Sequence, residues 1–331
     1  MDKYKSYTGI DYFRLISAIL IITIHTSPLA SFSAAGDFIL TRGAARVAVP
    51  FFFMTSGFFL ISRYSRDNGE LKKFVKKTAR IYGTAILIYI PVNIYNNYFH
   101  SDNLIPNIWK DLLFDGTIYH LWYLPASIFG AWIAWYLVRR LDYKRALIVS
   151  SVLYVIGLFG DSYYGIAEKI SGLNSFYQVV FQVSDYTRNG IFFAPVFFIL
   201  GGFIADTYHK ISFRNSVLGC GISFALMLAE AMLLHYLDLQ RHDSMYVFLL
   251  PCMYFLFHAI LHFQGKRLVW MRTLSLCIYI IHPMMIIAVR LLAKVAHLQN
   301  LLIENSMLHF LMVCFTSVAV SIVATALLED I

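Results

Sequence analysis

Charged side chains are scarce in this sequence. Lysine, arginine, aspartate and glutamate together make up only 14% of its 331 residues, whereas hydrophobic residues make up 59%. The mean hydropathy of +0.64 lies far above the value for soluble domains of this length. The composition therefore excludes an ordinary soluble globular protein and predicts a polytopic membrane protein.

Signals for metal sites and for secretion are also missing, and the sequence contains no clear internal repeat. The four cysteines lie within apolar runs at spacings unlike those of metal-binding proteins. His258 and His262 are four residues apart, but no third ligand accompanies them, so we expect no metal site. The first apolar run is too long for a signal-peptide core and lacks a clean cleavage site. We therefore expect this run to stay in the protein as a transmembrane helix.

Apolar runs, most of them about 17 to 25 residues long, occur throughout the chain, and a run of that length can cross a bilayer as a helix. They predict an all-α fold: a polytopic membrane helix bundle of about ten transmembrane helices, with residues 1–331 as a single domain. The predicted spans are 11–32, 44–62, 81–98, 118–138, 146–159, 191–206, 217–237, 245–263, 273–293 and 307–328.

Basic residues are concentrated in alternate loops. These loops contain Lys3, Lys5, Arg63, Arg66, Lys72, Lys73, Lys76, Lys77, Arg80, Arg139, Arg140, Lys144, Arg145, Lys210, Arg214, Lys266, Arg267 and Arg272. By the positive-inside rule, both termini and these loops lie in the cytoplasm. The net charge of +8 is thus explained by topology and anionic lipid, and no nucleic-acid partner is expected. The opposite side contains residues 160–190, whose amphipathic middle is expected to lie along the interface or to roof a cavity.

Two ionisable residues of the first span, Arg14 and His25, are costly to place in hydrocarbon, at least about 2.5 to 3.5 kcal/mol for a charged group at the centre of a bilayer. They are eleven residues apart, about 16 Å along a helix and almost in phase, so they face the same way. Asp11 shares that face and could pair with Arg14. A cavity with a cationic mouth and a deeper imidazole suits a long ligand with an anionic head and a reactive tip, such as acyl-coenzyme A.

Arg14 and His25, with ten residues between them, resemble the first-helix motif of the acyltransferase-3 family of integral membrane acyltransferases. Four further stretches fit that family in the same order: RVAVPFFFMTSGFF at 46–59, HLWYL at 120–124, Arg188 before 192–202, and SLCIYIIHP at 275–283. The resemblance covers essentially the whole chain. It implies that His25 is catalytic, that Arg14 and Arg46 support it or the donor, and that the donor is an acyl-CoA such as acetyl-CoA.

Within this family the chain is most similar to the membrane half of the serine racemases of vancomycin-resistant bacteria. The resemblance implies a multi-pass protein of the bacterial plasma membrane. We expect racemisation and its cofactor, pyridoxal phosphate, to belong to a cytoplasmic domain outside these 331 residues, together with any homodimer formed through that domain. L-serine then becomes a candidate small-molecule partner.

The acyl-transfer chemistry predicts roles for residues near His25. A neutral imidazole can remove the proton from an acceptor hydroxyl group as it attacks a thioester, so His25 is the predicted base. Glu230 lies at a similar estimated depth and is a candidate to orient His25; it could instead be a protonated buried acid or pair with Arg290. Lys76 and Arg80 could attract the phosphates of coenzyme A or only anionic lipid.

Five residues are candidates for binding the acceptor. Arg46 could hold a carboxylate through two hydrogen bonds or simply tie helices together. His120 and Trp122 could contact an acceptor or belong to the interfacial aromatic belt. Arg188 belongs to the family resemblance. His282, followed by a proline, breaks the ninth span near its middle, which suits the wall of a cavity.

Two functions remain open. The first is acyl transfer from cytoplasmic acyl-CoA to a hydroxyl acceptor at the outer side, by an acyltransferase that transfers groups other than aminoacyl groups. The second is L-serine transport into the cell to supply a racemase. A transferase needs a donor tunnel that meets an acceptor site, whereas a transporter exposes its site alternately to the two sides.

Overall fold

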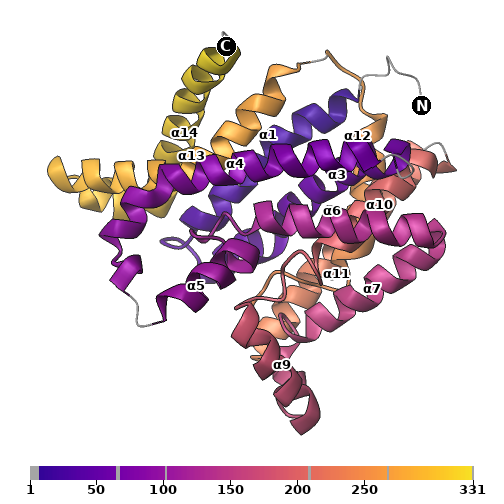
Figure 1. The fold of residues 1–331 in the computed structure, drawn as a ribbon. Helices are drawn as coiled ribbons and strands as arrows, with labels where there is room; N and C mark the ends of the chain where they lie inside the picture. The colour runs from indigo at the N-terminus through magenta and orange to yellow at the C-terminus, as the bar shows by residue number, and fades with distance from the viewer. Residues whose placement is uncertain (1–6, 65–67, 101–102, 208–209, 267, 330–331) are drawn as a thin grey trace. The chain divides into compact units, whose positions relative to one another are not determined.

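The computed structural model describes residues 7–64, 68–100, 103–207, 210–266 and 268–329. Within these ranges the chain is helical and contains no β-strand. Figure 1 draws these helices along the chain. The chain divides into two compact units. Unit 1 contains residues 1–52, 211–231 and 251–331, and unit 2 contains residues 53–210 and 232–250.

A helix occupies each predicted span. These helices are α1 (Thr8–Thr26), α3 (Ala48–Tyr64), α4 (Asn68–Tyr95), α6 (Tyr123–Arg140), α7 (Tyr143–Phe159), α10 (Ala194–Thr207), α11 (Phe213–Tyr236), α12 (Leu249–His262), α13 (Trp270–Val295) and α14 (Ser306–Glu329). Five segments of the described chain are long and apolar enough to cross a bilayer: 8–26, 34–61, 213–236, 270–295 and 306–327. The all-α class and apolar helices suited to a membrane bundle are confirmed. The number of spans and the side of the termini remain predictions.

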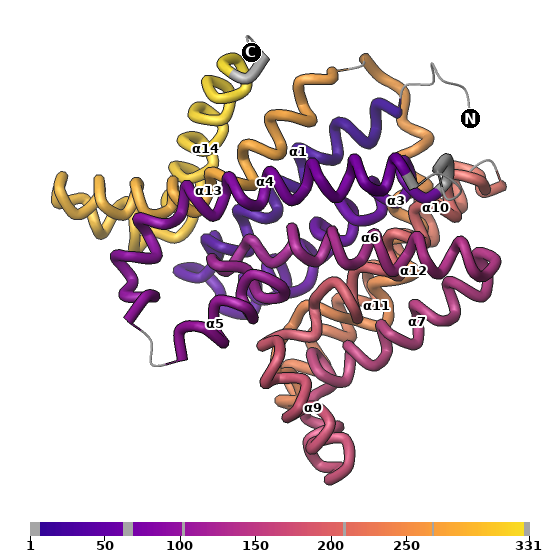
Figure 2. Tube along the Cα trace, viewed as in Figure 1, coloured from indigo at the N-terminus to yellow at the C-terminus, as the bar shows by residue number. Residues whose placement is uncertain are grey.

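Unit 1 is built around α1, which packs against α13 and α14. Ala18 and Ile22 of α1 form a buried core with Leu274 and Ile278 of α13 and Val313 of α14. The chain path through these helices can be followed by colour in Figure 2, from indigo α1 to yellow α14. At the start of α1, a Cβ on Gly9 would lie 2.0 Å from the Ile260 carbonyl oxygen, so only glycine allows α12 to approach this closely.

The first helix ends at Thr26, earlier than the predicted span, which reached residue 32. Ser27 adopts a left-handed conformation with φ of 48°, and its N–H bonds the Thr23 carbonyl oxygen at 3.1 Å. Pro28 follows, and a proline after such a C-cap cannot continue the helix. Because Pro28 was visible in the sequence, this end was predictable. His25 therefore lies in the last turn of α1.

Side-chain hydrogen bonds hold the loop that follows His25. Its segments are α2 (Ala34–Phe38), η1 (Ile39–Gly43) and η2 (Ala44–Val47). The Asp37 carboxylate accepts the Leu29 N–H at 3.0 Å, and the Ser306 hydroxyl donates to the Pro28 carbonyl oxygen at 2.8 Å. Ser306 begins α14, so the end of α1 is fixed to that helix. The chain directly after α1 is thus held both by the following loop and by α14.

Unit 2 contains α4, α6, α7 and α10 around an aromatic core in which Phe193 and Phe197 contact Tyr154 of α7. Small residues bring its helices close together. A Cβ on Gly57 of α3 would lie 2.0 Å from the Phe198 carbonyl oxygen of α10. A Cβ on Gly130 of α6 would lie 2.5 Å from the Ala194 Cβ. This is the close packing that small residues permit between membrane helices.

Residues 160–190 contain two short helices, α8 (Tyr164–Ala167) and α9 (Ser171–Val183), followed by an irregular segment. Tyr177 of α9 is buried against Tyr164, while Phe176 and Val179 are exposed. The amphipathic middle of this stretch thus forms a helix, α9. Its apolar outer face fits an interfacial position, which remains a prediction. Between α4 and α6, the chain forms η3 (Tyr98–His100), α5 (Leu104–Lys110) and η4 (Asp111–Asp115); η6 (Asn300–Glu304) precedes α14.

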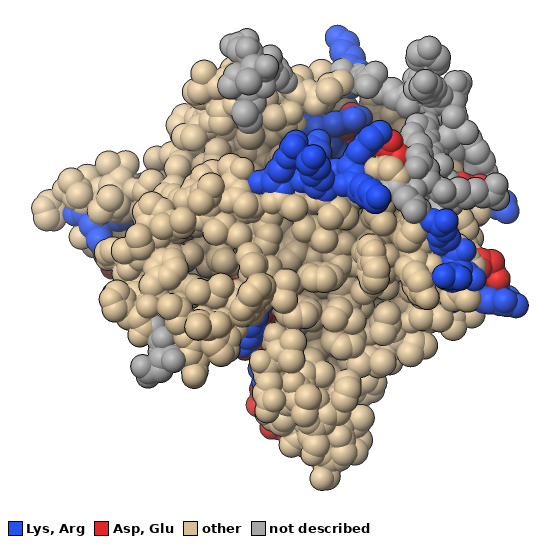
Figure 3. Space-filling view, in the orientation of Figure 1, with Lys and Arg blue, Asp and Glu red and all other residues tan. Residues whose placement is uncertain are grey.

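Basic residues gather at two places on unit 2: over the first half of α4 and where α6 joins α7 (Figure 3). The exposed members on α4 are Lys72, Lys73, Lys76, Lys77 and Arg80. Lys3, Lys5, Arg66 and Arg267, which the charge argument also used, lie outside the described residues. The clusters agree with the positive-inside pattern within this unit.

Candidate functional site

His25 lies against a second histidine of the predicted site. The rings of His25 on α1 and His282 on α13 are stacked, with centroids 5.4 Å apart and planes inclined by 20°. His282 is fully buried and His25 is half-buried. The structure thus brings together the predicted base and His282, an acceptor-binding candidate from the sequence. The predicted break of the ninth span at this point is wrong, because α13 is a continuous helix through Pro283.

One ring nitrogen of His282 has a defined role. Its Nδ1 lies 2.9 Å from the Tyr279 carbonyl oxygen and 3.2 Å from that of Ile278. A carbonyl oxygen can only accept, so Nδ1 carries the proton and donates. This hydrogen bond fixes the orientation of the ring that faces His25.

Arg14 lies on the same continuous helix as His25, so the two residues share a side of α1 at about 16 Å along its axis. Asp11, which the sequence offered as a partner of Arg14, binds Arg272 of α13. The Arg272 Nε donates to Asp11 Oδ1 at 2.8 Å, and a second guanidinium nitrogen lies 3.4 Å from Oδ2. This pair could not be predicted from sequence patterns, because it joins residues 261 positions apart.

Arg46 and Glu230 are also buried in unit 1. Arg46 is 7% exposed and lies in η2, which contacts α1. Glu230 of α11 is 8% exposed, and nearby Leu228 lies against Gly43 of η1. Both are buried as the predicted roles require. Whether Glu230 orients His25 remains a prediction.

In unit 2, two predicted acceptor-binding residues meet. The guanidinium of Arg188 lies 5.1 Å from the ring centroid of Trp122 and 4.4 Å from that of Tyr186, both within the range of cation–π attraction. It also donates to the Ser244 hydroxyl at 3.2 Å. His120 is buried against Tyr89, with ring centroids 5.2 Å apart, instead of lying exposed in an interfacial belt.

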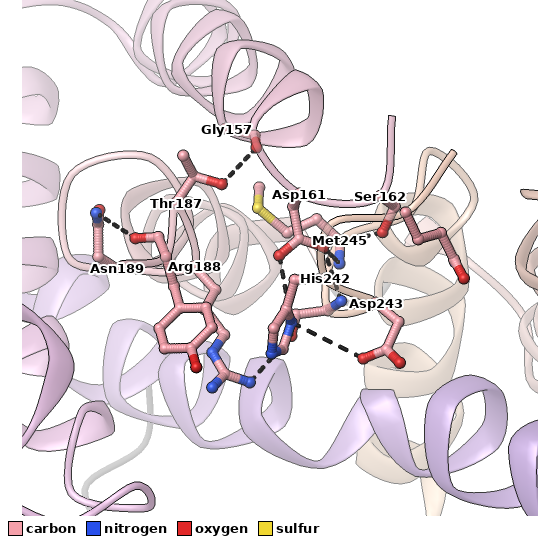
Figure 4. A network of polar contacts seen from close by, with 12 residues as sticks. Gly157, Asp161, Ser162, Thr187, Arg188, Asn189, His242, Asp243 and Met245 are labelled. Carbon is pink, nitrogen blue, oxygen red and sulfur yellow. Dashed lines mark hydrogen bonds and ion pairs between the residues drawn. The ribbon is translucent and has the colours of Figure 1, made fainter. Parts of the chain in front are cut away.

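Beside Arg188 is a polar network that no sequence pattern indicates (Figure 4). Asp161 lies in the turn after α7, and its Oδ1 accepts the N–H groups of Ser244 at 2.8 Å and Met245 at 3.0 Å. Its Oδ2 lies 3.6 Å from His242 Nδ1. Asp161 thereby ties the end of α7 to the segment between α11 and α12. No spacing in the sequence links positions 161 and 242.

This network lacks the arrangement of a hydrolytic triad. In such a triad the imidazole bridges the serine and the carboxylate through its two nitrogens. Here the Ser244 hydroxyl lies 2.8 Å from His242 Nδ1, the same nitrogen that faces Asp161. The network therefore serves to hold Arg188 and the two loops in place.

Burial raises the pKa of the Asp161 carboxyl group to about 6, although hydrogen bonds from Ser244 and Ser162 and the nearby Arg188 act to lower it. The unfolded value is about 3.9, so the folded state binds this proton more tightly. The stability contributed by that proton is complete below about pH 4 and is lost as the pH rises through about 6. The native protein therefore loses stability between pH 4 and 7, and we expect Asp161→Asn not to lose it. The Tm of the variant relative to that of the native protein should rise over this range, by a difference that corresponds to about 2 kcal/mol in the free energy of unfolding.

Thermal unfolding in detergent at several pH values measures this difference. Asp238→Asn is the matched control, because Asp238 is an exposed residue after α11 whose left-handed backbone conformation asparagine also adopts. Parallel pH profiles for Asp161→Asn and the native protein would contradict the prediction.

Comparison with known proteins agrees with the resemblance seen in the sequence. Residues 7–326 match the acyltransferase domain of the acyltransferase-3 family. An amino-acid racemase of Enterococcus faecalis is 56% identical over the whole chain, which covers 47% of that relative. A second E. faecalis amino-acid racemase is 38% identical over 93% of the chain and 44% of the relative. A serine/alanine racemase of Enterococcus gallinarum is 36% identical over 89% of the chain and 43% of the relative.

The chain spans less than half the length of each of these curated relatives. No solved structure matches it. The family match extends over nearly all described residues of both units, including His25, Arg188 and His282. The chain belongs to the acyltransferase-3 family and is a membrane protein with the predicted similarity to racemase relatives.

Proposed function

We propose that this chain transfers an acyl group from cytoplasmic acyl-CoA to a hydroxyl group of an acceptor at the outer side of the bacterial plasma membrane. The observation that carries the proposal is the position of His25. It lies in the last turn of α1, stacked on His282, in a chain that belongs to an acyltransferase family.

In the proposed reaction, His25 takes the proton of the acceptor hydroxyl group as its oxygen attacks the thioester carbonyl carbon. The carbon–sulfur bond then breaks, and the imidazolium of His25 returns the proton to the sulfur of coenzyme A. Glu230 is the candidate that orients His25 and stabilises its charged form. The products are an ester of the acceptor and free coenzyme A, so all atoms and charges balance.

Basic residues are the candidates for binding the donor. Arg14 and Arg46 belong to unit 1, as His25 does, while Lys76 and Arg80 are exposed on α4 in unit 2. Guanidinium and ammonium groups bind phosphate oxygens by charge-assisted hydrogen bonds. We assign Arg14, about 16 Å along α1 from His25, to the anionic head of the donor. Arg46 is assigned to the donor as well, and Lys76 and Arg80 to attraction of the coenzyme A phosphates.

For the acceptor, the stacked guanidinium of Arg188 beside Trp122 is the strongest candidate. A planar guanidinium that lies over two aromatic rings and donates to a hydroxyl group is preorganised to bind a carboxylate or another oxygen-rich group. Arg46, His120 and His282 remain further candidates, all of them buried.

The alternative function is L-serine uptake that supplies a racemase. It is favoured by the names of the relatives, which are amino-acid and serine/alanine racemases more than twice as long as the matched region. In that case the remainder of a full-length protein would bind pyridoxal phosphate, racemise serine and alanine, form any homodimer and serve vancomycin resistance.

Purified protein in nanodiscs tests the proposal. Acetyl-CoA binding and slow acetyl-CoA hydrolysis are measured for the native protein and for His25→Ala. The proposal expects binding in both and hydrolysis only in the native protein. If the native protein neither binds nor hydrolyses acetyl-CoA, and proteoliposomes accumulate labelled L-serine, the transport function would be established instead.

A further inference from the structure

A proline inside α13 changes the hydrogen bonding around His282. In an α-helix the carbonyl oxygen of residue 279 accepts the N–H of residue 283. Residue 283 is Pro283, which has no N–H, so the Tyr279 carbonyl oxygen lacks its usual backbone donor. The His282 Nδ1–H donates to this oxygen at 2.9 Å. The proline thus creates the acceptor that holds the neighbouring histidine.

This hydrogen bond determines the chemical state of the ring. Nδ1 carries the proton, so in the neutral ring Nε2 carries only a lone pair and cannot donate. The ring is fully buried, and burial disfavours a charged imidazolium unless another group compensates it. His282 is therefore set up as a neutral aromatic ring in a fixed orientation.

The face of that ring is turned to His25. Centroids 5.4 Å apart lie within the roughly 6 Å over which a cation is attracted to an aromatic face, and the 20° inclination keeps the rings stacked. When His25 takes a proton it becomes a cation. A neutral ring stacked on it stabilises this cation more than it stabilises neutral His25.

We propose that His282 is a positioning residue, held by the carbonyl oxygen that Pro283 frees, and that its neutral ring stabilises the imidazolium formed when His25 deprotonates the acceptor. The inference rests on the proposed acyl transfer. In that step the hydroxyl proton moves to His25, the acyl group moves from sulfur to oxygen, and the proton then passes to the coenzyme A sulfur.

Three substitutions separate this role from simple packing. His282→Asn keeps an N–H near Nδ1 for the Tyr279 carbonyl but removes the ring, so kcat is expected to fall about 5- to 30-fold with KM for acetyl-CoA unchanged. His282→Phe keeps the ring face and is expected to retain more activity than Asn. Pro283→Ala restores a backbone N–H that competes with Nδ1, so it is expected to lower kcat without loss of thermal stability.

Acyl transfer, acetyl-CoA binding and thermal unfolding are measured for each variant beside the native protein. If the native protein shows no acyl transfer, the proposed function is wrong and this inference is wrong with it. An active native protein whose kcat is unchanged in both His282→Asn and Pro283→Ala overturns the inference alone. A low kcat in Pro283→Ala with normal acetyl-CoA binding and normal stability supports it, even if His282→Asn does not fold.

Discussion

Replacing His25 by alanine is expected to lower the rate of acyl transfer by about 10² to 10⁴-fold, the usual contribution of a general base. His25 lies at the end of α1, where Ser27 and Pro28 stop the helix and hydrogen bonds to Asp37 and Ser306 hold the following loop. Because these two hydrogen bonds do not involve the imidazole, the variant should fold. The loss should appear in kcat, since the base acts in the transition state and not in donor binding.

His100→Ala is the control for this substitution, because His100 is an exposed histidine of η3. It should leave both the transfer rate and acetyl-CoA binding unchanged. If both His25→Ala and His100→Ala transferred acyl groups at the native rate, His25 would not be the base.

Replacing Arg272 by glutamine is expected to lower the free energy of unfolding by about 3 kcal/mol. Removing one partner of a buried ion pair typically costs 3 to 5 kcal/mol, because the other charge is left buried. Asp11 is only 1% exposed, but the Arg272 side chain is 38% exposed, which places the effect at the lower end of that range. The pair joins the first turn of α1 to the first turn of α13, so its loss should loosen unit 1 at this end.

Arg145→Gln provides the matched control. Arg145 forms an ion pair with Asp142 at 3.4 Å, but the two side chains are 74% and 58% exposed. An exposed pair of this kind contributes at most about 1 kcal/mol. Unfolding of all three proteins in the same detergent gives the comparison, and equal stability of Arg272→Gln and Arg145→Gln would refute the structural role of the Asp11 pair.

Hydropathy and helical phase account for the features that the sequence predicted well. Each long apolar run became a helix, because backbone groups in hydrocarbon must pair within one segment. The spacing of Arg14 and His25 placed them on one side of α1, because that geometry depends only on the residues between them. The early end of α1 at Pro28 was also encoded locally, although the predicted span passed over it.

Contacts between distant segments could not be predicted in the same way. The stacking of His25 on His282 joins residues of α1 and α13, and the Asp161–His242 pair joins two loops. Which face of one helix meets which face of another depends on side-chain packing along the whole contact, which the period of a single helix does not reveal. The family resemblance pointed to His282 as a site residue, but only the structure supplied its partner and its hydrogen bond.

The most direct test of the account follows the acyl group across the membrane. Proteoliposomes are prepared with the cytoplasmic face inside, acetyl-labelled acetyl-CoA is enclosed, and L-serine is supplied outside as a small hydroxyl acceptor alongside a mixture of simple sugars. Acyl transfer by this chain should give a labelled ester outside and free coenzyme A inside, and His25→Ala should form neither. Accumulation of external L-serine inside the vesicles, without labelled ester and without dependence on His25, would contradict it.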